Sequence, residues 1–170
     1  MTKTIREDTG QRMMHPFGPL YNGNSRILIL GSFPSVKSRE AQFFYGHPQN
    51  RFWRILAALC DADVPRSIEE KKRLVLDHGF ALWDVIASCE IVGSADSSIT
   101  DVVPNDLRPI LAGSRVQRIF CNGTTSFRLY TRYIRPVTGI EATCLPSSSP
   151  ANAAWSLDRL IAAWREAMEL

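Results

Sequence analysis

The stretch Arg26-Ile-Leu-Ile-Leu-Gly31 decides the fold class of this chain. Four consecutive aliphatic residues end at a glycine, which is too short a run for a buried helix and is typical of a strand covered on both faces. Strands of that kind belong to parallel sheets, in which helices connect one strand to the next. The sequence around this stretch is therefore expected to alternate between strands and helices.

Three further short apolar runs meet that expectation, and they predict strands over residues 80–86, 116–121 and 140–145. Apolar residues at helical spacing predict the following helices: one from Arg51 through Leu59, one over 67–79 that opens with the capping box Ser67-Ile-Glu-Glu70, one from Asn105 to Leu111, one from Thr124 to Ile134, and a last one whose apolar face carries Ala153, Leu157, Leu160, Ile161, Trp164 and Met168. This alternation predicts a three-layer α/β/α sandwich around a central four-stranded parallel sheet.

Length and composition indicate a single domain over residues 1–170, with residues 1–12 as a loose N-terminal tail. Apolar residues make up 45% of the chain and charged residues 22%, as in ordinary globular proteins. The polar N-terminus does not have the apolar core of a signal peptide, and no apolar run approaches the roughly 18 residues of a membrane helix. We therefore expect a cytoplasmic protein without membrane contacts, and a monomer. The net charge of +3 permits a polyanionic partner without requiring one.

The four cysteines, at positions 60, 89, 121 and 144, are too widely spaced to form a CxxC pair. The three histidines do not complete a metal-ligand pattern with them. Cys121 and Cys144 fall inside predicted strands, where buried free cysteines are common. We expect neither a metal ion nor any other cofactor.

Two segments that follow predicted strands carry the residues of chemical interest. The first is 31–50, a predicted long loop with two prolines, and the second is 145–152, a serine-rich turn. Because ligands of parallel sheets bind at the carboxyl ends of the strands, both segments are expected at one rim of the sheet. Residues 87–103 are predicted as a further polar loop, long enough to be either functional or disordered.

These segments resemble a known family. Gly31-Ser-Phe-Pro-Ser35 with His47-Pro-Gln-Asn-Arg-Phe-Trp53 resembles the mismatch-specific uracil and thymine-DNA glycosylases. Leu145-Pro-Ser-Ser-Ser-Pro-Ala-Asn152 resembles the second signature loop of the uracil-DNA glycosylase superfamily, and Phe120-Cys-Asn-Gly123 resembles its thymine-DNA branch. Leu82-Trp-Asp-Val-Ile-Ala-Ser-Cys-Glu90, together with Asp96-Ser-Ser and Val103-Pro-Asn-Asp106, is most similar to the hypoxanthine (deoxyinosine) DNA glycosylase branch. The resemblance runs from about residue 14 to the end.

The resemblance implies a monofunctional DNA glycosylase of base excision repair. Such an enzyme is a hydrolase that flips a deaminated base out of DNA and cuts its N-glycosidic bond with water. Hypoxanthine is the favoured base, and uracil, alone or in mismatches, is the alternative; xanthine is also open. The signature loops contain no lysine that could form a Schiff base, so we expect no lyase activity.

One position departs from the pattern of the mismatch branches. The asparagine that positions the attacking water there is replaced by Phe33. In the hypoxanthine branch the resemblance implies that Asn50 takes this role, so Asn50 is the expected catalytic residue. Because Asn50 precedes a predicted helix, an ordinary helix cap is the competing interpretation.

The resemblance and the strand ends together imply the remaining site residues. The expected base-binding residues are Phe33, Phe44, Tyr45, His47 and Asp84. The expected DNA-binding residues are Ser35, Ser147, Ser148, Ser149 and Asn152, the serines as a phosphate seat at a helix start and Asn152 as a candidate wedge. Each has a purely structural alternative, such as a core aromatic, a hydrogen-bonded histidine or a turn serine.

Two other functions remain open at this point. A serine hydrolase would need a nucleophile elbow of the type G-x-S-x-G, which the sequence does not contain. A non-catalytic nucleic-acid-binding module would keep the phosphate seat without a water-positioning group, and the replacement by Phe33 keeps it open.

Overall fold

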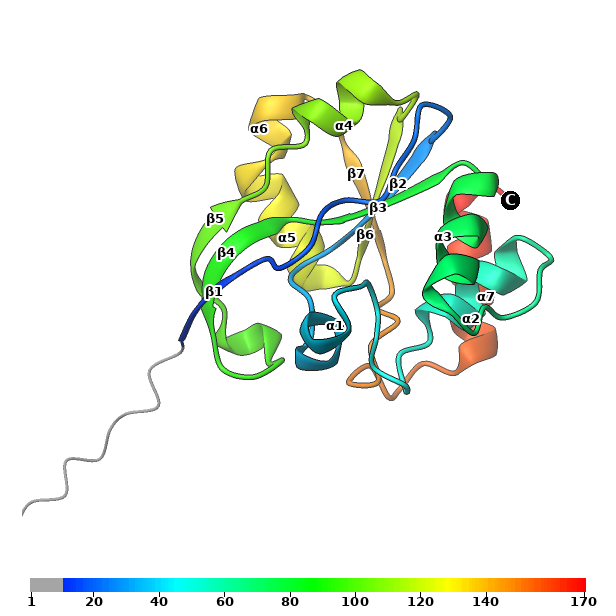
Figure 1. The fold of residues 1–170 in the computed structure, drawn as a ribbon, viewed down its shortest axis with the longest axis horizontal. Coiled ribbons are helices and arrows are strands. Elements are labelled where there is room, and N and C mark those ends of the chain that lie inside the picture. The colour runs from blue at the N-terminus through cyan, green and yellow to red at the C-terminus, as the bar shows by residue number, and fades with distance from the viewer. Residues whose placement is uncertain (1–10) are drawn as a thin grey trace, which may run out of the picture.

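The structure is a computed structural model and describes residues 11–170. Its centre is a parallel sheet in the order β3-β2-β6-β7 (Figure 1). The strands are β2 (Ile27–Gly31), β3 (Phe80–Asp84), β6 (Arg118–Asn122) and β7 (Ala142–Leu145). The stretch from Leu28 to Gly31 is fully buried, because β2 has a strand on each side and a layer of helices on each face. The predicted three-layer sandwich with a four-stranded parallel sheet is confirmed.

Helices cover both faces of the sheet (Figure 1). One face carries α2 (Phe52–Leu59), α3 (Ile68–Asp77) and α7 (Leu157–Met168), and the other carries α5 (Thr124–Tyr133) with α6 (Arg135–Thr138). The short helices α1 (Val36–Ala41) and α4 (Arg108–Gly113) lie at opposite ends of the sheet. No helix within residues 11–170 is long and apolar enough to cross a membrane.

A second sheet, which the sequence analysis missed, packs beside the first. It is antiparallel, in the order β1-β4-β5, with β1 at Gln11–Met14, β4 at Ile86–Ile91 and β5 at Thr100–Pro104. The expected loop over 87–103 is therefore wrong, and so is the expected loose tail at residues 11 and 12; residues 1–10 lie outside the described residues. Arg12 holds this sheet together by donating to Ser88 Oγ at 2.7 Å and to Asp101 O at 2.6 Å.

Several local predictions need correction as well. Residues 32–50 are not all loop, because they contain α1. Asn105 does not cap a helix; its side chain donates to the backbone oxygen of Asp84 at 2.8 Å, and α4 begins only at Arg108. Ala153 precedes α7, which starts at Leu157 with Ser156 as its N-cap. The capping box of α3 is confirmed, since Ser67 Oγ accepts from the Glu70 amide at 3.1 Å.

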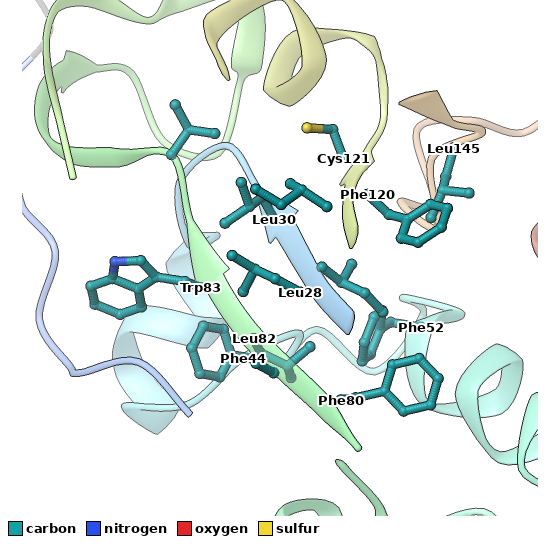
Figure 2. Close-up of a cluster of buried hydrophobic side chains, with 14 of the residues drawn as sticks. Leu28, Leu30, Phe44, Phe52, Phe80, Leu82, Trp83, Phe120, Cys121 and Leu145 are labelled. Carbon is teal, nitrogen blue, oxygen red and sulfur yellow. The ribbon is translucent and has the colours of Figure 1, made fainter. Parts of the chain in front are cut away.

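The core lies between the sheet and its two helical layers. Figure 2 shows Leu28 and Leu30 of the central strand between Leu82 of β3 and Phe120 of β6, with Phe52 of α2 closing one side. All five side chains are at most 1% exposed. Because α2 begins directly after the segment that carries Asn50, this packing fixes one wall of the site described below.

The stability of this core is testable with two isoleucines on helices. Ile55 on α2 is fully buried, whereas Ile68 on α3 is 41% exposed. We expect Ile55→Ala to lower the free energy of unfolding by about 2–5 kcal/mol, because it removes buried methyl groups and leaves a cavity. The matched Ile68→Ala is expected to change it by less than about 1 kcal/mol. Urea unfolding measures both, and equal losses would contradict the position of α2 in the core.

Candidate functional site

A cavity of about 610 Å³ opens at the carboxyl edge of the parallel sheet. Segments far apart in the sequence line it, namely residues 31–35, 44–50, 94–97 and 147–151 together with Asp84 and Asn122. In Figure 1 this is the lower edge of the sheet, where α1, the hairpin between β4 and β5 and the segment before α7 approach one another. The two segments expected at one rim of the sheet therefore do meet there.

Three polar side chains from different segments form a hydrogen-bonded chain in this cavity. Asn122, the last residue of β6, donates from Nδ2 to Ser148 Oγ at 2.9 Å, and its Oδ1 accepts from the Ser148 amide at 3.0 Å. Ser148 Oγ in turn donates to Asn50 Oδ1 at 2.8 Å. Asn50 is thus linked to a strand end through a serine that is fully buried.

The orientation of the Asn50 amide follows from its partners. Its Oδ1 accepts from the Phe52 amide at 3.0 Å as well as from Ser148. A backbone N–H can face only an acceptor, so Oδ1 is turned inward and Nδ2 is turned away from both partners. Among the described residues Nδ2 makes no hydrogen bond, and Asn50 lines the cavity. The capping interpretation holds in part, because Asn50 binds an amide of the first turn of α2 although Arg51 is the N-cap.

Arg51 anchors the segment that carries the serines. Its guanidinium donates to four backbone oxygens: those of Ser148, Ser149 at 2.8 Å, Asn152 at 3.0 Å and Trp155. Its own amide donates to the Ser148 oxygen at 3.1 Å. A planar guanidinium can serve several acceptors at fixed angles, so one side chain sets the path of the whole segment. Arg51 is therefore an internal anchor of the serine segment and not a fully exposed surface charge.

Aromatic side chains form the apolar wall of the cavity. Tyr45 stacks on Phe52 with ring centres 3.9 Å apart, and its backbone adopts a φ of 50°, a strained conformation for a non-glycine residue. Burial raises the pKa of the Tyr45 hydroxyl, and the nearby Asp84 carboxylate raises it further, so Tyr45 is a neutral O–H donor. Phe33 and Phe44 also line the cavity and are 8% and 3% exposed.

Asp84, the last residue of β3, is buried and pairs with His15. His15 Nε2 lies 2.7 Å from Asp84 Oδ2, and the two side chains are 3% and 6% exposed. The other oxygen, Oδ1, occupies the space above Gly31, where a Cβ would collide with it. A glycine is therefore required at the end of β2, because the carboxylate of the neighbouring strand fills the place of its side chain.

His47 and Ser35 line the cavity but are partly engaged in local structure. His47 Nδ1 accepts from the Gln49 amide at 3.1 Å, which leaves Nε2 as the free nitrogen of the ring. Ser35 is the N-cap of α1, where its hydroxyl accepts from the Ser38 amide at 3.2 Å and donates to Ser38 Oγ at 3.1 Å.

The serine-rich segment is not placed at a helix start, in contrast to the prediction. Seven residues lie between Ser149 and Leu157, where α7 begins. Ser147 and Ser149 are partly exposed and line the cavity, whereas Ser148 is buried between the two asparagines. The Asn152 side chain donates to the Ser147 oxygen at 3.0 Å, so it braces the segment instead of projecting from it.

The hairpin between β4 and β5 closes the remaining side of the cavity. Ser32 Oγ donates to Asp96 Oδ1 at 3.1 Å, and Ser94 Oγ accepts from the Val36 amide at 2.9 Å. Asp96 as a whole residue is exposed, but desolvation of its carboxylate raises its pKa; the Ser32 hydrogen bond opposes this shift and Asp84 adds to it. Residues 87–103 were expected to be a loop and not a hairpin, so Asp96 was not predicted as a site residue.

The residues that the sequence analysis missed are Asn122, His15, Arg51 as an anchor, and Asp96. Asn122 ends a parallel strand as Asp84 does, so the argument from strand ends would have found it. His15 meets Asp84 across 69 positions of sequence, and no periodicity marks such a contact. Within residues 11–170, no three His, Cys, Asp or Glu side chains gather closely enough to hold a metal ion.

Comparisons with known proteins match nearly the whole chain. A family model described as the uracil DNA glycosylase superfamily matches residues 19–168. A protein of Methanosarcina acetivorans named hypoxanthine DNA glycosylase is 35% identical over 144 residues, which are 84% of this chain and 90% of the relative. A protein of the same name from Methanosarcina barkeri is 33% identical over 156 residues, or 90% and 96% of the two chains.

A solved structure gives the same result. The solution NMR structure of a candidate uracil DNA glycosylase from Methanosarcina acetivorans aligns with a TM-score of 0.75 and 32% identity, over 91% of this chain and 98% of the other. The likeness thus covers nearly the whole of both chains.

The anchoring role of Arg51 predicts a local loss of order when its guanidinium is removed. Arg51→Met keeps the aliphatic stem and removes the guanidinium donors from the carbonyl oxygens of Ser148, Ser149, Asn152 and Trp155. We expect the free energy of unfolding to fall by about 1–3 kcal/mol, and the amides of Asn152 and Trp155 to exchange hydrogen faster. The exposed Arg54, one turn along α2, provides the matched control Arg54→Met. If both variants exchanged alike, Arg51 would not be the anchor.

Proposed function

The chain belongs to the uracil DNA glycosylase superfamily and is therefore a DNA glycosylase, and we propose that the base it removes is hypoxanthine. The two relatives that carry this name in Methanosarcina support the choice of base, because each aligns over most of its own length. The enzyme is a hydrolase that leaves an abasic site in the DNA. We further propose that it acts as a monomer and without a metal ion.

The observation that carries this proposal is the place of Asn50 relative to the cavity. Its amide is fixed by Ser148 and by the Phe52 backbone, and its free Nδ2 group lies at the wall of a cavity large enough for a flipped nucleotide. Phe33, Phe44 and Tyr45 supply the apolar surface against which a base can stack. Deeper in the cavity, Asp84 supplies a polar group for the edge of the base.

We assign to Asn50 the task of holding the attacking water. The reaction breaks the bond between C1′ of the sugar and the base nitrogen, and the sugar gains oxocarbenium character as the base leaves. Nδ2 donates to one lone pair of the water and the other lone pair attacks C1′, after which the water proton passes to solvent. A strong base is unnecessary because the sugar is already cation-like, so a fixed amide accelerates the reaction by orientation.

The leaving base takes the bonding electron pair and is stabilised by hydrogen bonds. Neutral donors on the cavity wall are suited to this task, since fixed dipoles stabilise charge as it develops. Tyr45 is one such donor, and the free Nε2 of His47 is another. The signature segments 31–35, 44–53 and 145–152 contain no lysine, so the reaction stops at the abasic site.

The partly exposed part of the serine segment is the proposed DNA contact. Ser147 and Ser149 flank the buried Ser148, and Pro150 and Ala151 follow at the rim of the cavity. Their rigid turn, held by Arg51, presents hydroxyl and amide groups suited to phosphate oxygens. Ser148 has a different role in this proposal. It accepts a hydrogen bond from Asn122 and donates one to Asn50, so it fixes the Asn50 amide relative to the end of β6. The Asn152 side chain supports the segment through its hydrogen bond to the Ser147 backbone oxygen.

Uracil is the second candidate base. The match to the superfamily model favours uracil as well, because a match to the whole superfamily does not distinguish its hypoxanthine branch from its uracil branches. Hypoxanthine and uracil share a ring N–H beside a carbonyl, so one set of polar groups accommodates both.

A glycosylase assay tests the proposal. We would incubate the protein with end-labelled single- and double-stranded oligonucleotides that carry one hypoxanthine, uracil, xanthine or thymine mismatch, and cut abasic sites with alkali. We expect cleavage at hypoxanthine, and no strand break before alkali. Asn50→Ala is expected to lower the single-turnover rate about 100-fold or more, because the water loses its fixed position.

The exposed Asn24, which lies at the opposite end of β2 from the cavity, supplies the matched control Asn24→Ala, expected to cleave like the wild type. Cleavage at uracil alone would overturn the choice of base while keeping the enzyme class. A rate unchanged by Asn50→Ala would remove Asn50 from the mechanism.

A further inference from the structure

We propose that His15 is a positioning residue that holds Asp84 as a hydrogen-bond acceptor for the ring N–H that deamination of adenine or cytosine creates, and that this pair separates hypoxanthine and uracil from those two parent bases. The inference rests on the proposed function and specifies how its site chooses a base. It concerns a residue on the segment before β2, which does not line the cavity.

The ring of His15 is fixed by its surroundings. It lies among aromatic side chains, with ring centres 4.4 Å from Trp83, 4.6 Å from Phe17 and 5.9 Å from Phe33. Nδ1 faces the Phe17 amide at 3.5 Å, which places an N–H donor on that nitrogen. The proton of the neutral ring therefore belongs on Nε2, which donates to Asp84 Oδ2 at 2.7 Å.

The same contact determines what Asp84 presents to the cavity. Oδ2 accepts from His15, so the carboxylate needs no proton of its own to make this bond. The backbone of residue 84 is fixed by its pairing with Gly31 and by Asn105. Oδ1 then remains over Gly31 at the cavity, beside the Tyr45 hydroxyl. Among the described residues His15 is the only basic side chain that pairs with Asp84.

Deamination changes the chemistry of the base at one ring nitrogen. In adenine N1 is an acceptor, whereas in hypoxanthine it carries hydrogen and is a donor; N3 changes in the same way from cytosine to uracil. A carboxylate accepts hydrogen bonds and cannot donate one. Asp84 Oδ1 therefore favours hypoxanthine and uracil, and it meets the N1 lone pair of adenine with repulsion. A site that leaves a buried polar group unpaired with the wrong substrate rejects it strongly.

The test is a comparison of cleavage rates at hypoxanthine and at adenine in single-stranded oligonucleotides. In Asp84→Asn, His15 Nε2–H must still face an oxygen, so the amide turns its N–H₂ group to the cavity. We expect the rate constant at hypoxanthine to fall about 10- to 100-fold and the ratio of hypoxanthine to adenine to fall at least as much, with KM changed far less than kcat.

His15→Phe preserves the ring packing and removes the donor, so it is expected to lower kcat at hypoxanthine about 10-fold, and His15→Gln, which restores an N–H donor, to recover part of it. His78→Gln is the matched control, because the ring of His78 binds the Leu74 oxygen at the end of α3, away from the cavity. A thermal unfolding curve for each variant verifies the fold.

The two proposals fail in different ways. Wild-type protein that leaves hypoxanthine uncut would overturn the proposed function. Wild-type protein that cuts hypoxanthine, together with an Asp84→Asn variant that keeps the wild-type ratio of hypoxanthine to adenine, would overturn the role of the His15–Asp84 pair. Asp84→Asn retains the aromatic packing around His15, so this outcome remains decisive even if the His15 variants do not fold.

Discussion

The convergence of four backbone oxygens on the Arg51 guanidinium is the constraint on which the site depends. Arg51 stands at the start of α2, whose apolar face is packed into the core, and the oxygens belong to a segment about a hundred positions later in the chain. The hydrogen bonds from Arg51 to these oxygens help to place Ser148 between Asn50 and Asn122. Without that contact the segment 148–155 keeps few hydrogen bonds to the rest of the chain, and Ser148, which supports the Asn50 amide, is held only by the Asn122 side chain and the Arg51 amide.

The strand ends supply the rest of the site. Gly31, Asp84 and Asn122 close three neighbouring parallel strands, so their positions are set by the register of the sheet. Parallel sheets place ligands at this edge because loops leave it on both faces. At the end of β2, Gly31 has no side chain, and this leaves room for the Asp84 carboxylate of the neighbouring strand β3. The cavity thereby combines an anionic acceptor, neutral donors and aromatic walls within one rim.

Prediction from the sequence succeeded where burial imposes a pattern and failed where it does not. β2 and β3 are buried almost throughout, so short apolar runs such as Leu28–Leu30 reveal them. The edge strand β7 is less buried, and it leaves Cys144 exposed where a buried cysteine was expected. The β4–β5 hairpin is half solvated and interrupted by register shifts, and its many polar residues give the sequence pattern of a loop. The placement of Asn50, Tyr45 and Asp84 in one cavity followed from topology and resemblance. The contacts of His15 and Arg51 cross 69 to 104 positions, and hydrogen bonds between such distant residues leave no periodic trace.

The most direct test of this account is a crystal structure of the Asn50→Ala protein bound to an oligonucleotide that contains deoxyinosine. The account predicts that the hypoxanthine lies outside the base stack and inside the cavity, with N1 within hydrogen-bond distance of Asp84 Oδ1 and C1′ facing position 50. A hypoxanthine that enters the cavity with its N7 edge toward Asp84, or that stays stacked in the DNA while the cavity remains free, would contradict it.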